Sequence, residues 1–204
     1  MKKFELTSET KVVFGRTLYR IKALVKFGDV NAGDLGGWIE AEKNLSQSGN
    51  AWVYGDAEVY GNAEVYGNAR VYGDARVSGN AEVYGNARVY GNADVSGNAW
   101  VYGNAEVYGN AEVSGDARVY GNAEVCKIGA VFWIGAIGSR NRTTTFFRCK
   151  DGKIRVSCGC FLGDLEEFAV KVKQTHGDNE HGRVYMLAIE MAKARIVEEK
   201  NEVH

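Results

Sequence analysis

The sequence predicts an all-β fold dominated by a parallel β-helix, and three observations support this prediction. First, a six-residue unit, Gly-(Asn/Asp)-Ala-x-Val-(Tyr/Ser), repeats thirteen times without insertion from Gly49 to Cys126, whose last copy ends in Cys. Second, the spacing of Ala and Val places both side chains on one face of an extended strand. Third, each unit begins with Gly-Asn or Gly-Asp, which tolerate the positive φ of a sharp corner. A short strand and a corner every six residues describe a coil with flat sides and an interior of Ala and Val.

The last residue of the unit indicates the number of sides. It is serine at Ser78, Ser96 and Ser114, which are eighteen residues apart. Between them it is tyrosine, in two series with the same spacing: Tyr54, Tyr72, Tyr90 and Tyr108, and Tyr66, Tyr84, Tyr102 and Tyr120. Three six-residue sides per coil therefore predict a triangular prism with two tyrosine faces and one face that is mostly serine.

The outer units are degenerate but keep the register, as capping repeats do. Inward slots fall on Leu45 and Gln47 before the perfect copies, and on Gly135 and Ile137 after them. We expect about six coils over residues 31–138. Residues 1–30 contain short strand-like runs at 11–14 and 18–21 and are expected to form a small β cap over the first coil.

Residues 139–204 have a different character and predict a ββαα C-terminal domain. Residues 143–148 and 153–157 flank Asp151-Gly152, a pair typical of a hairpin turn. Asp164 has the properties of a helix N-cap, with Glu167 three residues later, and this helix should end at His176-Gly177. A second helix is expected over about 180–199, with apolar residues along one face.

The repeats resemble the hexapeptide-repeat, left-handed parallel β-helix superfamily, and the resemblance covers about half of the chain. It implies left-handed coiling and, as the usual assembly, a trimer with the coils side by side. Acyltransferases of this superfamily use a histidine as general base, and its γ-class carbonic anhydrases bind zinc through three histidines. The three histidines of this chain all lie outside residues 31–138. We therefore expect no enzymatic chemistry on the coils.

Nearly the full length also resembles uncharacterised proteins of bacterial phages and prophages. The matching segments are Leu-Tyr-Arg-Ile at 18–21, Gly-Asp-Leu-Gly-Gly-Trp-Ile-Glu at 33–40, Gly-Ser-Arg at 138–140, Gly-Cys-Phe at 159–161 and His-Gly at 176–177. This resemblance implies an origin and no established activity. By analogy, small phage proteins without enzymatic motifs often act by sequestering host defence proteins or signalling nucleotides.

Composition narrows the classes of partner. A net charge of −1 provides no field that would attract duplex nucleic acid or an anionic membrane. The chain has no apolar run of membrane-spanning length and no signal-peptide core, so the cytoplasm is the expected location. Its four cysteines are then expected to be reduced thiols. A zinc site from Cys149, Cys158, Cys160 and His176 is an alternative, but Cys-x-Cys is tighter than the usual ligand spacing, and we expect no cofactor.

The tyrosine series predict a surface for self-association. Tyrosine is favoured at interfaces because its ring is apolar and its hydroxyl is polar. We expect a homo-oligomer, with a trimer as the first model, through the eight tyrosines of the two series. The alternative is that the rings stack on one another and protect the edges of the prism.

The C-terminal domain contains the concentrated charge. Residues 139–155 hold six basic side chains and one acid, Asp151. Guanidinium forks with hydroxyl donors are suited to an anion. The predicted ligand-binding residues are Ser139, Arg140, Arg142, Thr144, Thr145, Arg148, Cys160 and His176. The alternative is a solvated basic hairpin.

These patterns favour a non-enzymatic, oligomeric binding protein. Its β-helix would serve as scaffold and assembly surface, and its basic hairpin would bind an anionic small ligand, such as a nucleotide signal, or a host protein. One alternative is an enzyme with an acyltransferase-like or zinc-dependent site in the C-terminal domain, around Arg140, Cys160 and His176. Another is a purely structural virion or filament component.

Overall fold

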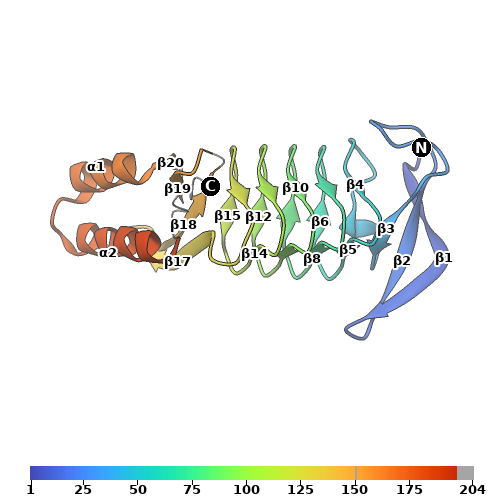
Figure 1. Ribbon diagram of the computed structural model, residues 1–204, viewed down its shortest axis with the longest axis horizontal. Helices are drawn as coiled ribbons and strands as arrows, with labels where there is room; N and C mark the ends of the chain where they lie inside the picture. The colour runs from blue at the N-terminus through green and yellow to red at the C-terminus, as the bar shows by residue number, and fades with distance from the viewer. Residues whose placement is uncertain (150, 197–204) are drawn as a thin grey trace, which may run out of the picture.

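The computed structural model describes residues 1–149 and 151–196 of the 204-residue chain. The molecule is elongated, with a β-hairpin at the N-terminal end, a stack of coils in the middle and two helices at the other end (Figure 1). Within the described part of the chain, no helix is both long enough and apolar enough to cross a membrane.

The perfect repeats form short strands, each made of the variable residue and the Val of one unit. They are β4 (Trp52–Val53), β5 (Glu58–Val59), β6 (Glu64–Val65), β7 (Arg70–Val71), β8 (Arg76–Val77), β9 (Glu82–Val83), β10 (Arg88–Val89), β11 (Asp94–Val95), β12 (Trp100–Val101), β13 (Glu106–Val107), β14 (Glu112–Val113), β15 (Arg118–Val119) and β16 (Glu124–Val125). Each pairs in parallel with the strand eighteen residues away, as Val71, Val89 and Val107 illustrate. The predicted triangular parallel β-helix is confirmed.

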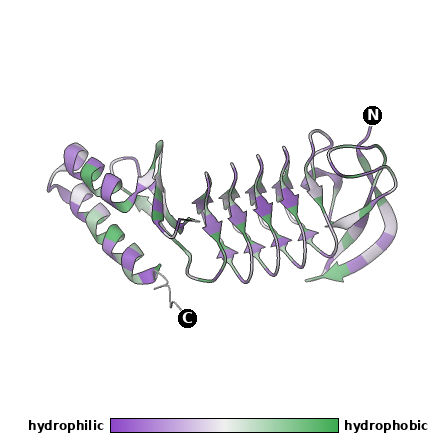
Figure 2. Cartoon of the chain, turned by 45° about the horizontal axis from the view of Figure 1, so that its top comes forward, coloured by the Kyte–Doolittle hydropathy of each residue, from purple (hydrophilic) through white to green (hydrophobic). Residues whose placement is uncertain are grey.

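Three parallel ladders form the sides of the prism. They run β3-β5-β8-β11-β14, β4-β7-β10-β13-β16 and β6-β9-β12-β15, where β3 is Leu35–Ile39. The coils therefore number about five, not six. Their interior is the predicted one, because the Ala and Val of every perfect unit are at most 2% exposed. Figure 2 shows hydrophilic and hydrophobic residues alternating along the coils.

The corners combine a required glycine with a ladder of side-chain amides. Gly79 has φ +70°, and a Cβ atom on it would lie 2.9 Å from the carbonyl oxygen of Gly97 in the next coil. Beside the glycines, Asn68 donates to Asn86 at 3.1 Å, and Asn86 donates to Asn104 at 3.1 Å. Each coil therefore satisfies the corner amides of its neighbour, which explains the preference for Asn over Asp at this position.

The N-terminal cap is a longer hairpin than the sequence predicts. Strands β1 (Phe4–Val13) and β2 (Arg16–Ala23) are antiparallel, and β2 also pairs with β3 in the same sheet as one side of the prism. Phe4 and Ile21 are fully buried in the core that the coils share.

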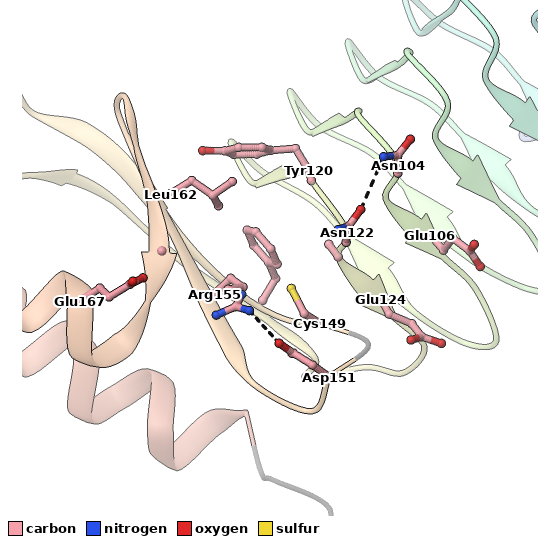
Figure 3. A pocket seen from close by; sticks show the side chains of 14 residues that line it. Asn104, Glu106, Tyr120, Asn122, Glu124, Cys149, Asp151, Arg155, Leu162 and Glu167 are labelled. Atoms are coloured by element: carbon pink, nitrogen blue, oxygen red, sulfur yellow. Dashed lines mark hydrogen bonds and ion pairs between the residues drawn. The ribbon is translucent and has the colours of Figure 1, made fainter.

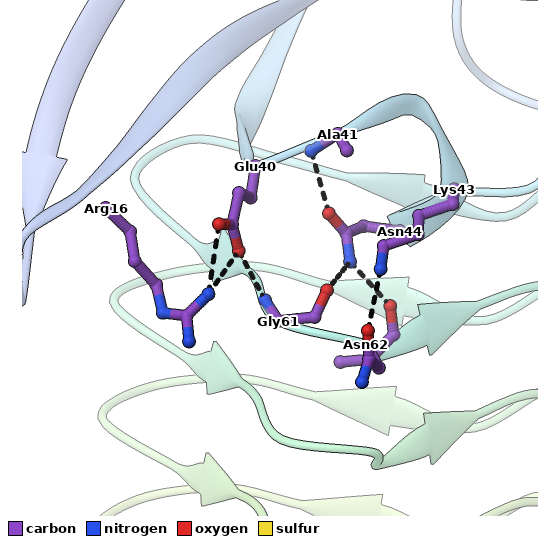
Figure 4. Close-up of polar contacts among 8 residues, drawn as sticks. Arg16, Glu40, Ala41, Lys43, Asn44, Gly61 and Asn62 are labelled. Atoms are coloured by element: carbon purple, nitrogen blue, oxygen red, sulfur yellow. Dashed lines mark hydrogen bonds and ion pairs between the residues drawn. The ribbon is translucent and has the colours of Figure 1, made fainter.

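Polar side chains fasten this cap where the hexad pattern is degenerate (Figure 4). Glu40 accepts hydrogen bonds from the Arg16 guanidinium at 3.0 Å and from the backbone N–H of Gly61 at 2.7 Å. The backbone bond is the main cause of the lowered pKa of Glu40. After the short 3-10 helix η1 (Glu42–Asn44), the buried Asn44 amide donates to the carbonyl oxygen of Ala63 at 2.8 Å. These bonds satisfy backbone groups that lack a regular coil partner.

The C-terminal sheet differs from the prediction at both edges. It has the antiparallel order β17-β18-β19-β20, with strands β17 (Val131–Ile137), β18 (Arg142–Arg148), β19 (Ile154–Cys158) and β20 (Phe161–Asp164). The predicted hairpin is β18-β19. Residues 131–137, which were expected to continue the coils, instead pair with β18, and β20 was not predicted. The register of the repeat therefore ends before Val131.

Two helices cover one face of this sheet. They are α1 (Leu165–His176) and α2 (Glu180–Arg195), which packs against α1 and β17. Asp164 and Glu167 form the expected capping box of α1. Phe146, Phe168 and Ile189 belong to a core separate from that of the coils. Residues 197–199 of the second predicted helix lie outside the described residues.

Candidate functional site

The last coil and the C-terminal sheet meet at a junction with two hollows. The contact is specific, since Thr145 on β18 accepts a hydrogen bond from the backbone N–H of Arg118 on β15 at 3.0 Å. Trp133 on β17 packs over Gly115, where any side chain would overlap the indole ring. The last coil and the C-terminal sheet therefore form fixed walls on either side of each hollow.

The larger hollow, here called the acidic cleft, has a volume of about 910 Å³. Its coil wall comes from β13, β16 and the corner between β15 and β16, and its other wall from β18, β19, β20 and the start of α1 (Figure 3). The lining residues are Asn104, Glu106, Tyr120, Gly121, Asn122, Ala123, Glu124, Phe147, Cys149, Asp151, Arg155, Leu162, Gly163 and Glu167.

An apolar surface runs along one side of the acidic cleft. Tyr120 is the last ring of a tyrosine stack, 4.7 Å from Tyr102 between ring centroids, and its ring lies 6.1 Å from that of Phe147. The Tyr120 hydroxyl donates to the carbonyl oxygen of Phe161 at 3.4 Å, which fixes the ring against the C-terminal sheet. Leu162, which is 45% exposed, completes this surface from β20.

Carboxylates predominate among the charged side chains of the described lining. Arg155 is the single cation among the described lining residues, and its guanidinium lies 2.7 Å from Asp151 and 3.8 Å from Asp164. Glu106 and Glu124 are direct neighbours in the ladder, so two negative charges occupy adjacent rungs. Directly opposed like charges disfavour each other. The described lining therefore carries an excess of negative charge.

Tyrosine hydroxyls orient these two carboxylates. Tyr90 donates to Glu106 at 3.0 Å, and Tyr108 donates to Glu124 at 2.6 Å. The bond to Glu124 is the main cause of the raised pKa of Tyr108. Each hydroxyl occupies one carboxylate oxygen, and the other oxygen of Glu106 lies 3.7 Å from the Arg88 guanidinium.

Cys149 lies between the two walls of the acidic cleft (Figure 3). Burial raises the pKa of its thiol to about 11, so the group stays protonated at neutral pH. A thiolate is the reactive form of cysteine, and this environment disfavours it. The described lining contains no imidazole. Among the described lining residues, the environment of Cys149 therefore does not activate it as a nucleophile.

The second hollow, here called the arginine groove, has a volume of about 520 Å³. The guanidinium of Arg118 stacks on the indole of Trp100, one coil away, at 4.4 Å. The exposed Arg142 enters from the start of β18. Asp116 supplies the one carboxylate and accepts a hydrogen bond from Asn98 at 2.9 Å. The lining residues are Asn98, Trp100, Asp116, Arg118, Asn141, Arg142, Thr143 and Gly159.

The structure does not gather the predicted ligand-binding residues in one site. Arg142 lines the arginine groove, and Ser139 and Arg140 are exposed in the turn that precedes it. Thr144, Thr145 and Arg148 are buried in β18, and the remaining two predicted residues lie elsewhere. The exposed Cys160 lies in the β19–β20 turn, His176 ends α1 beside the ring of Tyr185, and Lys150 lies outside the described residues.

The residues of the zinc alternative are likewise dispersed. Cys149 lines the acidic cleft, whereas the Cys158 sulfur lies 3.3 Å from the Thr144 hydroxyl and 3.6 Å from that of Tyr185. Over residues 1–149 and 151–196, no three His, Cys, Asp or Glu side chains are grouped so that they could hold a metal ion.

The tyrosine series form stacks along two edges of the prism. Ring centroids in successive coils are 4.7 to 5.0 Å apart, and the planes lie within 10° of each other. The rings are half-buried. The self-stacking that the sequence analysis gave as the alternative is present, and self-association through these rings stays a prediction. The stacked residues are Tyr66, Tyr84, Tyr102 and Tyr120, and Tyr72, Tyr90 and Tyr108, whereas Tyr54 donates to Asp29 at 3.2 Å.

Sequence reasoning did not identify the acidic cleft. One signal was available, because Glu106 and Glu124 place two negative charges on adjacent rungs of one ladder. Phe147 and Leu162 carry no comparable signal, since their approach to Tyr120 depends on how the C-terminal sheet docks on the last coil.

Comparison with known proteins agrees with the fold. The model of the YdcK Beta solenoid repeat matches residues 63–79, 69–85, 81–97 and 87–103. A stretch of 37 residues is 51% identical to the Uncharacterized acetyltransferase YdcK of Escherichia coli (strain K12), which is 18% of this chain and 11% of that protein. The family-model match spans residues 63–103, which lie within the repeats and include Asn98 and Trp100 from the lining of the arginine groove. Together with the coils, the two matches confirm the hexapeptide-repeat β-helix that the sequence predicts.

Proposed function

We propose that this protein is a non-enzymatic binding scaffold and that its arginine groove holds an anionic small ligand. The observation that supports this proposal is the position of two arginines. Arg118 on the coils and Arg142 on the C-terminal sheet line the same groove. A volume of about 520 Å³ lies within the range of small-molecule sites, which is about 300–1,000 Å³.

The groove has chemistry for both parts of a nucleotide. A guanidinium can grip a phosphate through two parallel hydrogen bonds. The Trp100–Arg118 stack also provides a flat surface on which a base can lie, since bases stack on guanidinium planes as well as on aromatic rings. A nucleotide is therefore the anionic ligand that we favour, in agreement with the host signalling molecules suggested by the phage and prophage resemblance.

Calorimetric titration with linear and cyclic nucleotides tests this proposal. Arg142→Lys keeps the charge but loses the fork, so we expect affinity to fall about tenfold or more, roughly 1.4 kcal/mol. Arg88→Lys, an exposed substitution on β10 outside the groove, is the matched control and should leave affinity unchanged. Added salt should weaken binding, because it screens exposed charges. If no nucleotide produces heat, the arginine groove is not a nucleotide site, and recognition of a host protein becomes the better account.

Acetyl transfer is the second candidate, because the partial match is to a protein named as an uncharacterised acetyltransferase. The described histidines, His176 and His181, lie on α1 and α2 and line neither hollow. Release of coenzyme A from acetyl-coenzyme A in the presence of amine and hydroxyl acceptors would favour this candidate over the binding scaffold.

We also propose that the protein self-associates through its tyrosine edges, in the host cytoplasm if it is phage-encoded. The stacked rings support this proposal, since they present half-buried apolar surface in two straight lines. A side-by-side trimer, the usual assembly of the superfamily that the repeats resemble, remains our first model for the assembly.

A further inference from the structure

The arginine groove lies where the next rung of two ladders would be. In a further coil, the residues that follow Asp116 and Arg118 in their ladders would be Ile134 and Ala136. Both belong instead to β17, which pairs with β18. The backbone N–H of Arg118, which in a regular coil would donate to the next coil, donates to the Thr145 hydroxyl at 3.0 Å. Asp116 and Arg118 therefore end their ladders, and both line the groove.

The ladder that ends at Arg118 leaves a flat face. Its guanidinium stacks on the indole of Trp100 in the preceding coil at 4.4 Å. Among the described residues, this indole is the only aromatic ring over which the guanidinium lies, and Arg118 is exposed. A base can lie on the other face of the guanidinium, because bases stack on guanidinium planes.

The ladder that ends at Asp116 leaves hydrogen-bond acceptors. Along this corner each side-chain amide donates to the next rung, from Asn80 to Asn98 at 2.9 Å and from Asn98 to Asp116 Oδ1 at 2.9 Å. An asparagine in the last rung would offer N–H groups to the groove, whereas a carboxylate only accepts. Among the described residues, Asn98 is the only hydrogen-bond partner of the Asp116 side chain, which leaves Oδ2 as an acceptor. A ligand in the place of the next rung must therefore donate hydrogen bonds from its edge.

Guanine is the base whose edge fits this requirement. It carries two adjacent donors, N1–H and the 2-amino group, which match the two oxygens of one carboxylate. Adenine and cytosine each have a ring nitrogen that accepts beside their amino group, and this lone pair would face Asp116. Uracil has a single N–H between two carbonyl groups. These three bases would therefore place an acceptor against an acceptor.

We infer that the arginine groove is specific for guanine nucleotides, an inference that rests on the nucleotide function proposed above. The guanine continues the Trp100–Arg118 stack, its N1–H and 2-amino group donate to Asp116, and Arg142 holds the phosphate from the C-terminal sheet. Asp116 thus determines which base binds. A site that accepts hydrogen bonds from its ligand disfavours an analogue that lacks the donors, because the polar group of the site is then left unpaired.

Calorimetric titration of the full-length protein with guanosine, inosine and adenosine monophosphates tests the specificity. Guanosine monophosphate should bind about tenfold or more tighter than adenosine monophosphate. Inosine monophosphate keeps N1–H but lacks the 2-amino group, so its affinity should lie between the other two.

Asp116→Asn tests which residue contacts the base. The side-chain amide offers one acceptor and one donor, which match the N1–H and the 2-carbonyl group of xanthine. The variant should therefore bind guanosine monophosphate about tenfold more weakly than the parent protein and should prefer xanthosine monophosphate. A gain of affinity for a new ligand cannot result from loss of the fold. Asp74→Asn, the same change at the same position of an exposed unit outside the groove, is the matched control and should leave each affinity within about twofold.

The outcomes separate this inference from the proposed function. If guanosine and adenosine monophosphates bind equally and Arg142→Lys weakens both, the base specificity is wrong and the proposed function stands. If Asp116→Asn still prefers guanosine over xanthosine monophosphate, Asp116 does not contact the base and the inference is overturned. If none of the four nucleotides binds, the proposed function fails and the guanine specificity fails with it.

Discussion

At the scale of the residue, the unit of this fold is a pair of inward side chains. Val89 is fully buried in the middle of the stack, and Ala87 beside it is buried as well. The strand alternation places Arg88 between them on the outside, where its side chain is 52% exposed. A single sequence position therefore separates a slot that excludes charge from one that tolerates it.

Substitution at these two neighbours should give unequal losses of stability. Val89→Asp would bury a carboxylate without a partner between coils and should cost several kcal/mol of unfolding free energy. Arg88→Ala removes only a contact of 3.7 Å to Glu106 and should cost under about 1 kcal/mol. Thermal unfolding followed by circular dichroism measures both. Equal losses would contradict the inward and outward assignment.

Residue periodicity also explains how much of the fold the sequence could predict. Strand geometry alone determines that Ala87 and Val89 point into the coil and that Arg88 points outward. The prediction that Ala and Val point inward is therefore correct at every perfect unit. Phe147 and Leu162 belong to no repeat, and their place beside Tyr120 depends on contacts between segments far apart in the chain. The candidate hollows were therefore only partly visible in the sequence, through Arg142 and the Trp100–Arg118 pair.

At the scale of the element, local signals were sufficient where a strand or helix is defined by its own residues. The Asp151-Gly152 turn and the Asp164 cap correctly placed β18, β19 and the start of α1. Residues 131–137 resembled another repeat, yet pairing with β18 determines their conformation. A period of two residues fits a strand of either sheet, so the sequence could not decide between them.

The tyrosine stacks should resist ionisation as a group. Burial raises the pKa of Tyr102 to about 12, and burial together with a hydrogen bond to Glu82 raises the pKa of Tyr66 as well. The folded protein therefore holds protons that the unfolded chain releases near pH 10. The free energy of unfolding is fully retained below about pH 10 and should fall as pH rises from there through the folded pKa values.

Tyrosinate absorbance as a function of pH measures this effect. The folded protein should titrate at higher pH than the same protein in guanidinium chloride, where the tyrosines have ordinary pKa values. Coincident titration curves would contradict the stacked, half-buried arrangement of the rings.

At the scale of the whole molecule, the two tyrosine stacks follow the axis of the coils, one from Tyr66 to Tyr120 and the other from Tyr72 to Tyr108. If they form the subunit contact, replacing both Tyr72 and Tyr90 by Glu should produce monomers that keep the circular dichroism of the β-helix. The double replacement of Ser78 and Ser96 by Glu, on the third edge, should leave the assembly intact. Sedimentation velocity gives the masses, and an unchanged mass for the tyrosine variant would rule out this interface.

The coils also fix the distance between the two ends of the protein. Each coil contacts the next through the same ladder, so adding or removing eighteen residues should leave the hairpin cap and the C-terminal junction as they are. The separation of the ends would then change in steps of about 4.8 Å, the spacing of neighbouring strands. The β-helix is in this respect a molecular ruler, whose length can vary by whole coils while the hairpin cap and the C-terminal sheet keep their structure.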